Sequence, residues 1–464
     1  MPSRGPDVRP GREGSELTQT HHTRARVVPP SVLRPMTQTD EGRQEMMSPG
    51  ATNVVAARRQ RGVITNADFD EILEAPEDET MIINMGPQHP STHGVLRLMV
   101  ELDGEEVLRV QPVVGYLHTG MEKTAENLMY IQGSTNVTRM DYLAPMTNEL
   151  CFSLAVERLL DIEVPPRAAA VRVLMCELNR IASHMLWFAT TGMDVGQTTI
   201  MIHGLREREK ILSFFEKTTG LRMNHDYIRP GGVAADLPDG WEHDVAEILD
   251  VLPPRIAESR ELFDPNPIFQ RRTQGVGELT REEALALGVT GPVLRASGVA
   301  WDLRKAFPYS GYDLYEFDVP VWDTCDVWGR YQVRMAEIGE SVRICRQVLD
   351  AMPRGDYRVQ DKKVTPPPRR RIDTSMEALI HHFKLYTEGF KVPEGETYVG
   401  VESPRGELGC YLVADGGAKA YRQHTRGPSF VHVHALPPMM VGGLVADAIV
   451  TIAAVDPVLG EVDR

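Results

Sequence analysis

The sequence lacks the features that are typical of a membrane-spanning, a secreted or a nucleic-acid-binding protein. No apolar run approaches the roughly eighteen uncharged residues that a membrane-spanning helix needs, and the first residues carry no apolar signal core. The formal net charge is −15, whereas phosphate binding relies on clustered Lys and Arg. We therefore expect a protein that folds in the cytoplasm, binds no nucleic acid and contacts a membrane only through partners.

Cysteine is scarce, and no two thiols form a CxxC pair. A G-x-G-x-x-G loop that opens a helix is also missing, so we expect neither a metal nor a flavin on this chain. Scattered thiols without a signal sequence indicate reduced, packing residues rather than a disulfide framework. The five are Cys151, Cys176, Cys325, Cys345 and Cys410.

What is present indicates a globular domain behind a polar extension. The chain of 464 residues is 42% hydrophobic and 25% charged, which suits a large buried core. Residues 1–75 are rich in Pro, Arg, Gly, Ser and Thr and lack periodicity, which predicts a disordered extension, or an over-long start with Met36 as the true one. Their acidic residues argue against an organelle transit peptide. One folded domain is expected over residues 76–464.

Hydrophobic periodicity predicts an α+β architecture, with a mainly helical core flanked by small antiparallel sheets at both ends. The turn Asp103-Gly104 joins two alternating strands into a hairpin, and long helical stripes follow. The expected elements are a hairpin over 96–110, a buried helix from Pro165-Pro166 to at least Met185, a helix from Tyr331 to Met352, a helix from the capping box Thr374-x-x-Glu377 to Gly389, and strands at 397–401 and 408–414.

The least ordinary stretch is Gly86-Pro-Gln-His-Pro-Ser-Thr-His-Gly94, a turn-rich loop before a strand. Such a loop can present an imidazole, from His89 or His93, into a cavity. Two histidines four residues apart can bind one metal ion from the same face of a helix, but Pro90 between them prevents a helix here. The alternative, favoured for any isolated pair, is that both histidines hydrogen-bond the loop backbone.

Three further clusters carry polar groups into apolar surroundings. Arg139-Met140-Asp141-Tyr142 stands before the apolar run 150–160, so it needs partners or a ligand, although a Tyr satisfied by its neighbour is as good an interpretation. Glu177, Arg180 and His184 share one helix face. From the local sequence we interpret these three residues as an ordinary surface ion pair with a nearby histidine, and the alternative is an internal polar network. Asp194 lies where that helix should end, either orienting an imidazole or capping the next segment.

Taken together, several motifs resemble the D-type subunit of respiratory complex I, from about residue 81 to the end. The resemblance implies a quinone-binding subunit of a proton-translocating NADH:quinone oxidoreductase, peripheral on the cytoplasmic side of the cell (inner) membrane. The motifs are the loop 86–94, Gly115-Tyr-Leu-His-Thr-Gly120, Thr138-Arg-Met-Asp-Tyr-Leu143, Arg295-Ala-Ser-Gly298, Pro308-Tyr-Ser-Gly-Tyr312, Thr374-Ser-Met-Glu377 and Asp456-Pro-Val.

That family is similar to the large subunit of [NiFe] hydrogenases, whose metal is held by two CxxC pairs. Here Asp141 and Ala144 replace the first pair, and Val458 and Glu461 replace the second, so thiolate ligation is impossible. The resemblance therefore implies an empty cavity, shared with a B-type subunit that holds a terminal [4Fe-4S] cluster, which admits a quinone headgroup. A C-type subunit and the H-type subunit of the membrane arm are the other implied partners.

By motif match, His93 and Tyr142 would hydrogen-bond the two quinone oxygens, and Asp194 would pair with His93. That pairing favours imidazolium, so proton loss would leave a negative charge able to trigger proton pumping. The remaining implied roles are cofactor contacts: His89 shapes the loop, Arg405 stabilises the cavity, and Arg139, Arg180 and His184 face the partner's cluster.

Three alternatives remain open at this point. An energy-converting hydrogenase is opposed by the absence of both CxxC pairs. A scaffold subunit without a catalytic role is opposed by the set His93, Tyr142 and Asp194. Related chloroplast or archaeal complexes with another electron donor share the site, and the choice between ubiquinone and menaquinone is not encoded in it.

Overall fold

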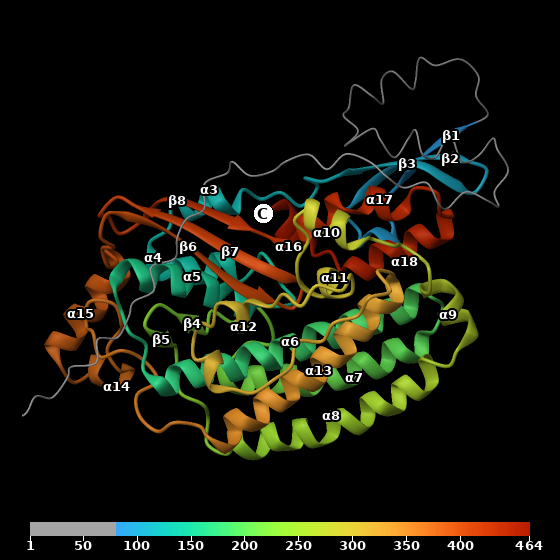
Figure 1. Ribbon diagram of the computed structural model, residues 1–464. Helices are drawn as coiled ribbons and strands as arrows, with labels where there is room; N and C mark the ends of the chain where they lie inside the picture. Colours follow the sequence, from blue (N-terminus) through green and yellow to red (C-terminus); the bar gives the residue numbers. More distant parts are fainter. Residues whose placement is uncertain (1–79) are drawn as a thin grey trace, which may run out of the picture. The chain divides into compact units, whose positions relative to one another are not determined.

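The computed structural model describes residues 80–464, so the extension predicted for residues 1–75 lies outside them. The described part combines a bundle of long helices with small antiparallel sheets, which confirms the α+β prediction (Figure 1). None of its helices has both the length and the apolar character needed to cross a membrane.

The first sheet contains three antiparallel strands in the order β1 (Met81–Met85), β2 (Arg97–Asp103) and β3 (Glu106–Val113). The predicted hairpin is therefore confirmed, with Val100 opposite Val110 and Gly104 at a φ of +60° in the turn. The buried side chains of this sheet pack on α17 (Leu436–Met440) and α18 (Val445–Val455).

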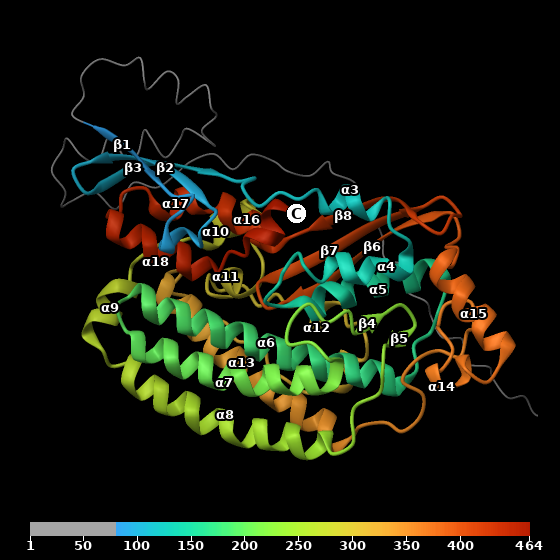
Figure 2. The same ribbon diagram turned by 180° about the vertical axis from the view of Figure 1, so that it is seen from behind.

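Four long helices form the main core: α6 (Pro166–Asp194), α7 (Thr198–Thr219), α8 (Trp241–Phe263) and α13 (Val327–Asp350), which lie alongside one another in both views (Figures 1 and 2). Gly204 lets α6 and α7 approach closely, since a Cβ there would lie 2.7 Å from the Met185 carbonyl oxygen.

Two of these helices, α6 and α13, were predicted from the sequence. The other two were not, because α7 carries a dense run of charges and α8 contains two consecutive prolines, Pro253 and Pro254.

The second sheet has the order β6 (Gly395–Ser403), β7 (Gly406–Ala414) and β8 (Ala420–Arg426) and packs on α5 (Pro145–Leu160). Two of its strands were predicted. The β6–β7 turn presses against the segment Thr290–Gly291: a Cβ on Gly291 would lie 2.3 Å from the Arg405 carbonyl oxygen. This close approach fixes Arg405 in the interior.

The helix predicted from Thr374 is present as α15 (Met376–Thr387), but Ser375 rather than Thr374 caps it by accepting a hydrogen bond from the Ala378 amide at 3.3 Å. The remaining elements are η1 (Pro90–Thr92), α3 (Met121–Ala125), α4 (Tyr130–Val137), β4 (Ile228–Arg229), β5 (Gly232–Val233), α9 (Pro267–Thr273), α10 (Arg281–Ala286), α11 (Gly291–Arg295), α12 (Leu303–Ala306), η2 (Tyr312–Leu314), α14 (Arg369–Ile372), α16 (Pro428–His434) and α19 (Leu459–Asp463).

Candidate functional site

Arg405 joins two segments that lie more than 300 residues apart in sequence. Its Nη1 is 2.8 Å from Asp141 Oδ2, its Nε donates to the Asp456 carbonyl oxygen at 3.0 Å, and its Nη2 is 3.2 Å from Asp456 Oδ2. Burial would lower the pKa of Arg405, but the two carboxylates outweigh it and hold the pKa above its usual value. An ion-paired bridge therefore connects the two motifs in which the cysteine pairs are missing.

Tyr142 follows Asp141 and is half-buried against Gly460, whose hypothetical Cβ would lie 3.1 Å from the ring. Its hydroxyl makes no hydrogen bond to any residue between 80 and 464. Burial raises the pKa of Tyr142, and the nearby Arg405 charge partly offsets that rise. The phenol is therefore protonated at neutral pH, with its hydroxyl free to donate.

His93 ends η1 with a φ of +54°, and its backbone N–H donates to the Pro90 carbonyl at 3.3 Å. Crowding by surrounding atoms, and then the Arg405 charge, lowers the pKa of His93 to about 4. The side chain is nevertheless exposed on this chain, so a partner or a ligand can contact it. The Arg405 charge thus contributes to the pKa shifts of both His93 and Tyr142.

His89 holds the loop in shape. Its Nδ1 accepts a hydrogen bond from the Ser91 amide at 3.2 Å, and so caps η1. The interpretation that a histidine here hydrogen-bonds the loop backbone therefore holds for His89, whereas the His93 ring makes no hydrogen bond within the described residues.

Asp194 is the last residue of α6, as predicted, and burial raises its pKa to about 6. The Asp194 carboxylate makes neither a hydrogen bond nor an ion pair with His93 or with another residue of 80–464. Its helix and the loop element η1 each pack against α18. The direct pairing of Asp194 with His93 stays a prediction, and the lowered pKa of His93 does not favour imidazolium in this chain.

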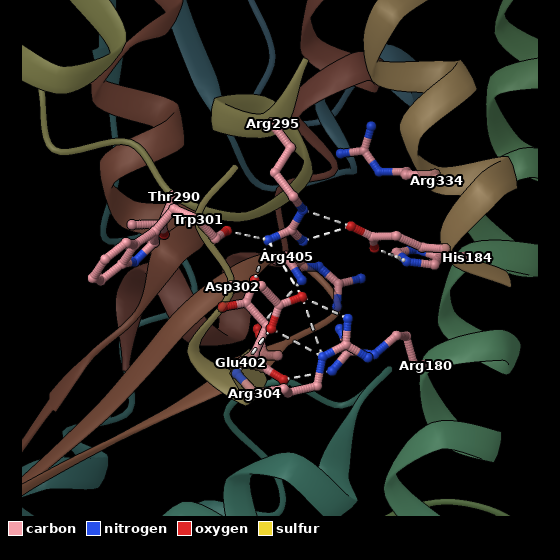
Figure 3. A network of polar contacts seen from close by, with 12 residues as sticks. Arg180, His184, Thr290, Arg295, Trp301, Asp302, Arg304, Arg334, Glu402 and Arg405 are labelled. Atoms are coloured by element: carbon pink, nitrogen blue, oxygen red, sulfur yellow. Dashed lines mark hydrogen bonds and ion pairs between the residues drawn. The ribbon is translucent and has the colours of Figure 1, made fainter. Parts of the chain in front are cut away.

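Arg180 and His184 belong to a second polar network, all of it buried (Figure 3). Glu177 is at its centre: Arg304 Nη1 lies 3.1 Å away, Arg180 Nε lies 3.3 Å away, and the Tyr312 hydroxyl donates at 2.7 Å. The local interpretation of this helix face as a surface ion pair is therefore wrong, because neighbouring segments supply enough partners for the charges to be buried.

The other half of this network surrounds Arg295, which bonds Glu337 and Glu402, both at 2.8 Å. Glu337 in turn lies 2.9 Å from His184 Nε2. Burial would raise the pKa of Glu337, but Arg295 and His184 hold it well below its usual range. Burial lowers the pKa of His184, which makes it a neutral imidazole at pH 7.

Arg334 was not predicted from the sequence. It is fully buried on α13, stacks 4.3 Å over the Trp187 ring, and its Nε and Nη2 have no partner within residues 80–464 (Figure 3). Burial lowers its pKa to about 10. A detectable signal was present, since Arg334 and Glu337 sit three apart and flank Met335 and Ile338 of the predicted apolar seam.

Arg139 lies outside both networks. It is exposed, and its Nε donates to the Thr135 carbonyl at 3.3 Å. The two cavities that we describe also lie elsewhere: the larger, about 800 Å³, is lined by α5, β6 and the loop that contains Phe307. Within residues 80–464, no cluster of three or more His, Cys, Asp or Glu side chains could hold a metal ion.

Comparisons with known proteins agree on one family. The family described as respiratory-chain NADH dehydrogenase, 49 kDa subunit, matches residues 194–464. The D 1 subunit of NADH-quinone oxidoreductase from Salinispora tropica is 51% identical over 435 residues, covering 89% of this chain and 99% of that protein. The D 2 subunit from Roseiflexus sp. (strain RS-1) is 55% identical over 394 residues, with 84% and 94% covered. The D-type subunit from Frankia alni is 52% identical over 421 residues, with 86% and 90% covered.

Proposed function

Because the chain belongs to the 49 kDa, or D-type, subunit family of NADH-quinone oxidoreductases, and is thus a subunit of that oxidoreductase complex, we propose that it forms the quinone-binding site. The observation that carries the proposal is Arg405. This one buried cation binds Asp141 and Asp456 and shifts the pKa values of both His93 and Tyr142. The pKa values of both proposed donors to the quinone therefore depend on a single charge.

Reduction of a quinone to a quinol takes two electrons and two protons, one proton at each oxygen. The electrons come from a [4Fe-4S] cluster on the neighbouring B-type subunit. As negative charge develops on the oxygens, the phenol of Tyr142 and the ring N–H of His93 each donate a hydrogen bond at one end of the headgroup. Arg405 stabilises this charge from within the protein.

Proton delivery by His93 requires its pKa to rise in the assembled site. A carboxylate beside the ring has that effect, and Asp194, at the end of α6, is the group proposed to supply it. Once His93 has given up its proton, Asp194 carries an uncompensated negative charge. That charge is the proposed signal for proton translocation in the membrane arm.

The proposed assembly follows from the same family. The B-type and C-type subunits and the H-type subunit of the membrane arm surround this chain, which lies at the cytoplasmic side of the cell membrane without a spanning helix in residues 80–464. In this assembly a partner covers the exposed His93 side chain and completes the headgroup site.

The test is quinone reduction by the assembled complex in membranes that carry Tyr142→Phe. We expect a loss of at least tenfold, because one donor to the developing negative charge is removed, while electron transfer to an artificial acceptor upstream remains normal. The matched control is Tyr421→Phe, at a tyrosine that is 69% exposed on β8. Unchanged quinone reduction in Tyr142→Phe would demote this chain to a scaffold.

A further inference from the structure

The helix α15 presents an apolar face that nothing in the described chain covers. Met376, Leu379, Ile380 and Phe383 follow the spacing i, i+3, i+4 and i+7, which puts them on one side of the helix. They are 69%, 47%, 50% and 65% exposed, respectively. Side chains of this size are rarely left together in water unless they bind something.

The opposite side of α15 is fixed to the protein. Leu385 is buried and belongs to the same hydrophobic cluster as Tyr130 of α4 and Phe152 of α5. Both views place α14 and α15 at one edge of the described part, with no other described helix or strand outside them (Figures 1 and 2). The apolar face is therefore held in place while facing outward.

The surroundings of this face are basic, although the whole chain has a net charge of −15. Residues 361–391 contain seven Lys and Arg against four Asp and Glu. Arg369, Arg370 and Arg371 are the first three residues of the short helix α14, which precedes α15. All three are exposed, and none makes an ion pair within residues 80–464. An apolar stripe flanked by three unpaired guanidinium groups is complementary to an apolar groove with an acidic rim.

We propose that α15 docks through Met376, Leu379, Ile380 and Phe383 into such a groove on a neighbouring subunit of the oxidoreductase complex. The twelve-residue helix is about 18 Å long, enough for a helix-in-groove contact with four anchors. The inference rests on membership of a multi-subunit family and is independent of the quinone site.

Two other occupants fit the observations less well. A second copy of this chain would bring two sets of arginines together, and the repulsion would oppose pairing. An anionic lipid surface would accept the arginines, but Asp373 and Glu377 in and before the first turn of α15 would meet like charge there. Both occupants are outcomes of the test.

The test places a photo-crosslinking phenylalanine analogue at Phe383, and separately at Leu379, in the complex assembled in membranes. The matched control carries the analogue at Glu388, an exposed residue at the end of the same helix that lies away from the apolar face. Adducts are identified by mass spectrometry. We expect both face positions to couple to one and the same neighbouring protein, several-fold more strongly than the control, at a peptide that contains acidic residues.

A second measurement tests the charge contribution. Replacing Arg369, Arg370 and Arg371 with alanine should make the cross-linked neighbour dissociate at a lower salt concentration, because attraction to an acidic rim is lost. Adducts with lipid, with a second copy of this chain, or with several neighbours equally would overturn the proposal. If the analogue at Phe383 prevents assembly, it is moved to Tyr386 at the edge of the same face, and the same outcomes decide. The quinone-reduction result for Tyr142→Phe does not bear on these readouts, so either proposal can fail alone.

Discussion

Replacing Arg405 with methionine is the most informative single perturbation, because it removes the charge and keeps most of the side-chain volume. The substitution leaves Asp141 and Asp456 buried without the cation that lies 2.8 and 3.2 Å from them. Breaking a buried pair by removing one partner costs about 3–5 kcal/mol, which is roughly a hundredfold to a few thousandfold in the folding equilibrium.

The same substitution changes the electrostatics of both proposed donors. The charge of Arg405 lowers the pKa of Tyr142 and of His93, so its removal should raise both values. A raised pKa of His93 keeps the imidazolium form to higher pH. The pH profile of quinone reduction should therefore shift to the alkaline side in complexes that still assemble.

The assay follows three quantities in membranes: the amount of assembled complex, the temperature at which quinone reduction is lost, and the pH profile of the rate. Arg405→Met should lower the first two and shift the third. Adding Asp141→Asn should recover part of the stability, since one unpaired carboxylate is removed, but should leave the shift in pH profile. Normal assembly, normal thermal inactivation and an unchanged pH profile in Arg405→Met would refute this account of the site.

Two further predictions concern the segment around Glu461. Burial and the neighbouring Asp141 raise the pKa of Glu461 from 4.5 to about 7, so the stability that its proton confers is lost as pH rises through about 7. Glu461→Gln should flatten that loss in thermal-inactivation curves between about pH 5 and about pH 8, and an unaltered slope would contradict the assignment. Gly460→Ala should reduce quinone reduction at least tenfold, since a Cβ would lie 2.5 Å from the Met140 carbonyl oxygen and 3.1 Å from the Tyr142 ring. The control is Gly443→Ala, where the nearest atom to a Cβ is 3.3 Å away. Equal rates in the two variants would exclude displacement of the Tyr142 ring.

The hydrophobic periodicity of a segment was enough to predict the helices and strands whose formation depends mainly on the residues of that segment. The stripes of α6 and α13, the Asp103-Gly104 hairpin and the β6–β7 pair all follow from side-chain spacing and turn chemistry, and each is present. The motifs likewise identified the family, because their order along the chain carries information that no single short motif has. The exposed stripe of α15 has the same local pattern as a core helix, so the pattern alone could not reveal which of the two it is.

Only the tertiary structure decided which polar groups are buried and which of them meet. Glu177, Arg180 and His184 have the spacing of a surface cluster, but Arg304 and Glu337, from distant segments, supply charges that make their burial possible. Arg405 reaches Asp141 and Asp456 across more than 250 and about 50 residues of sequence, respectively, and no local preference encodes such a contact. The sequence by itself thus determined the family, the main elements and the candidate donors, whereas long-range packing decided their charges, because a pKa depends on what surrounds a group in space.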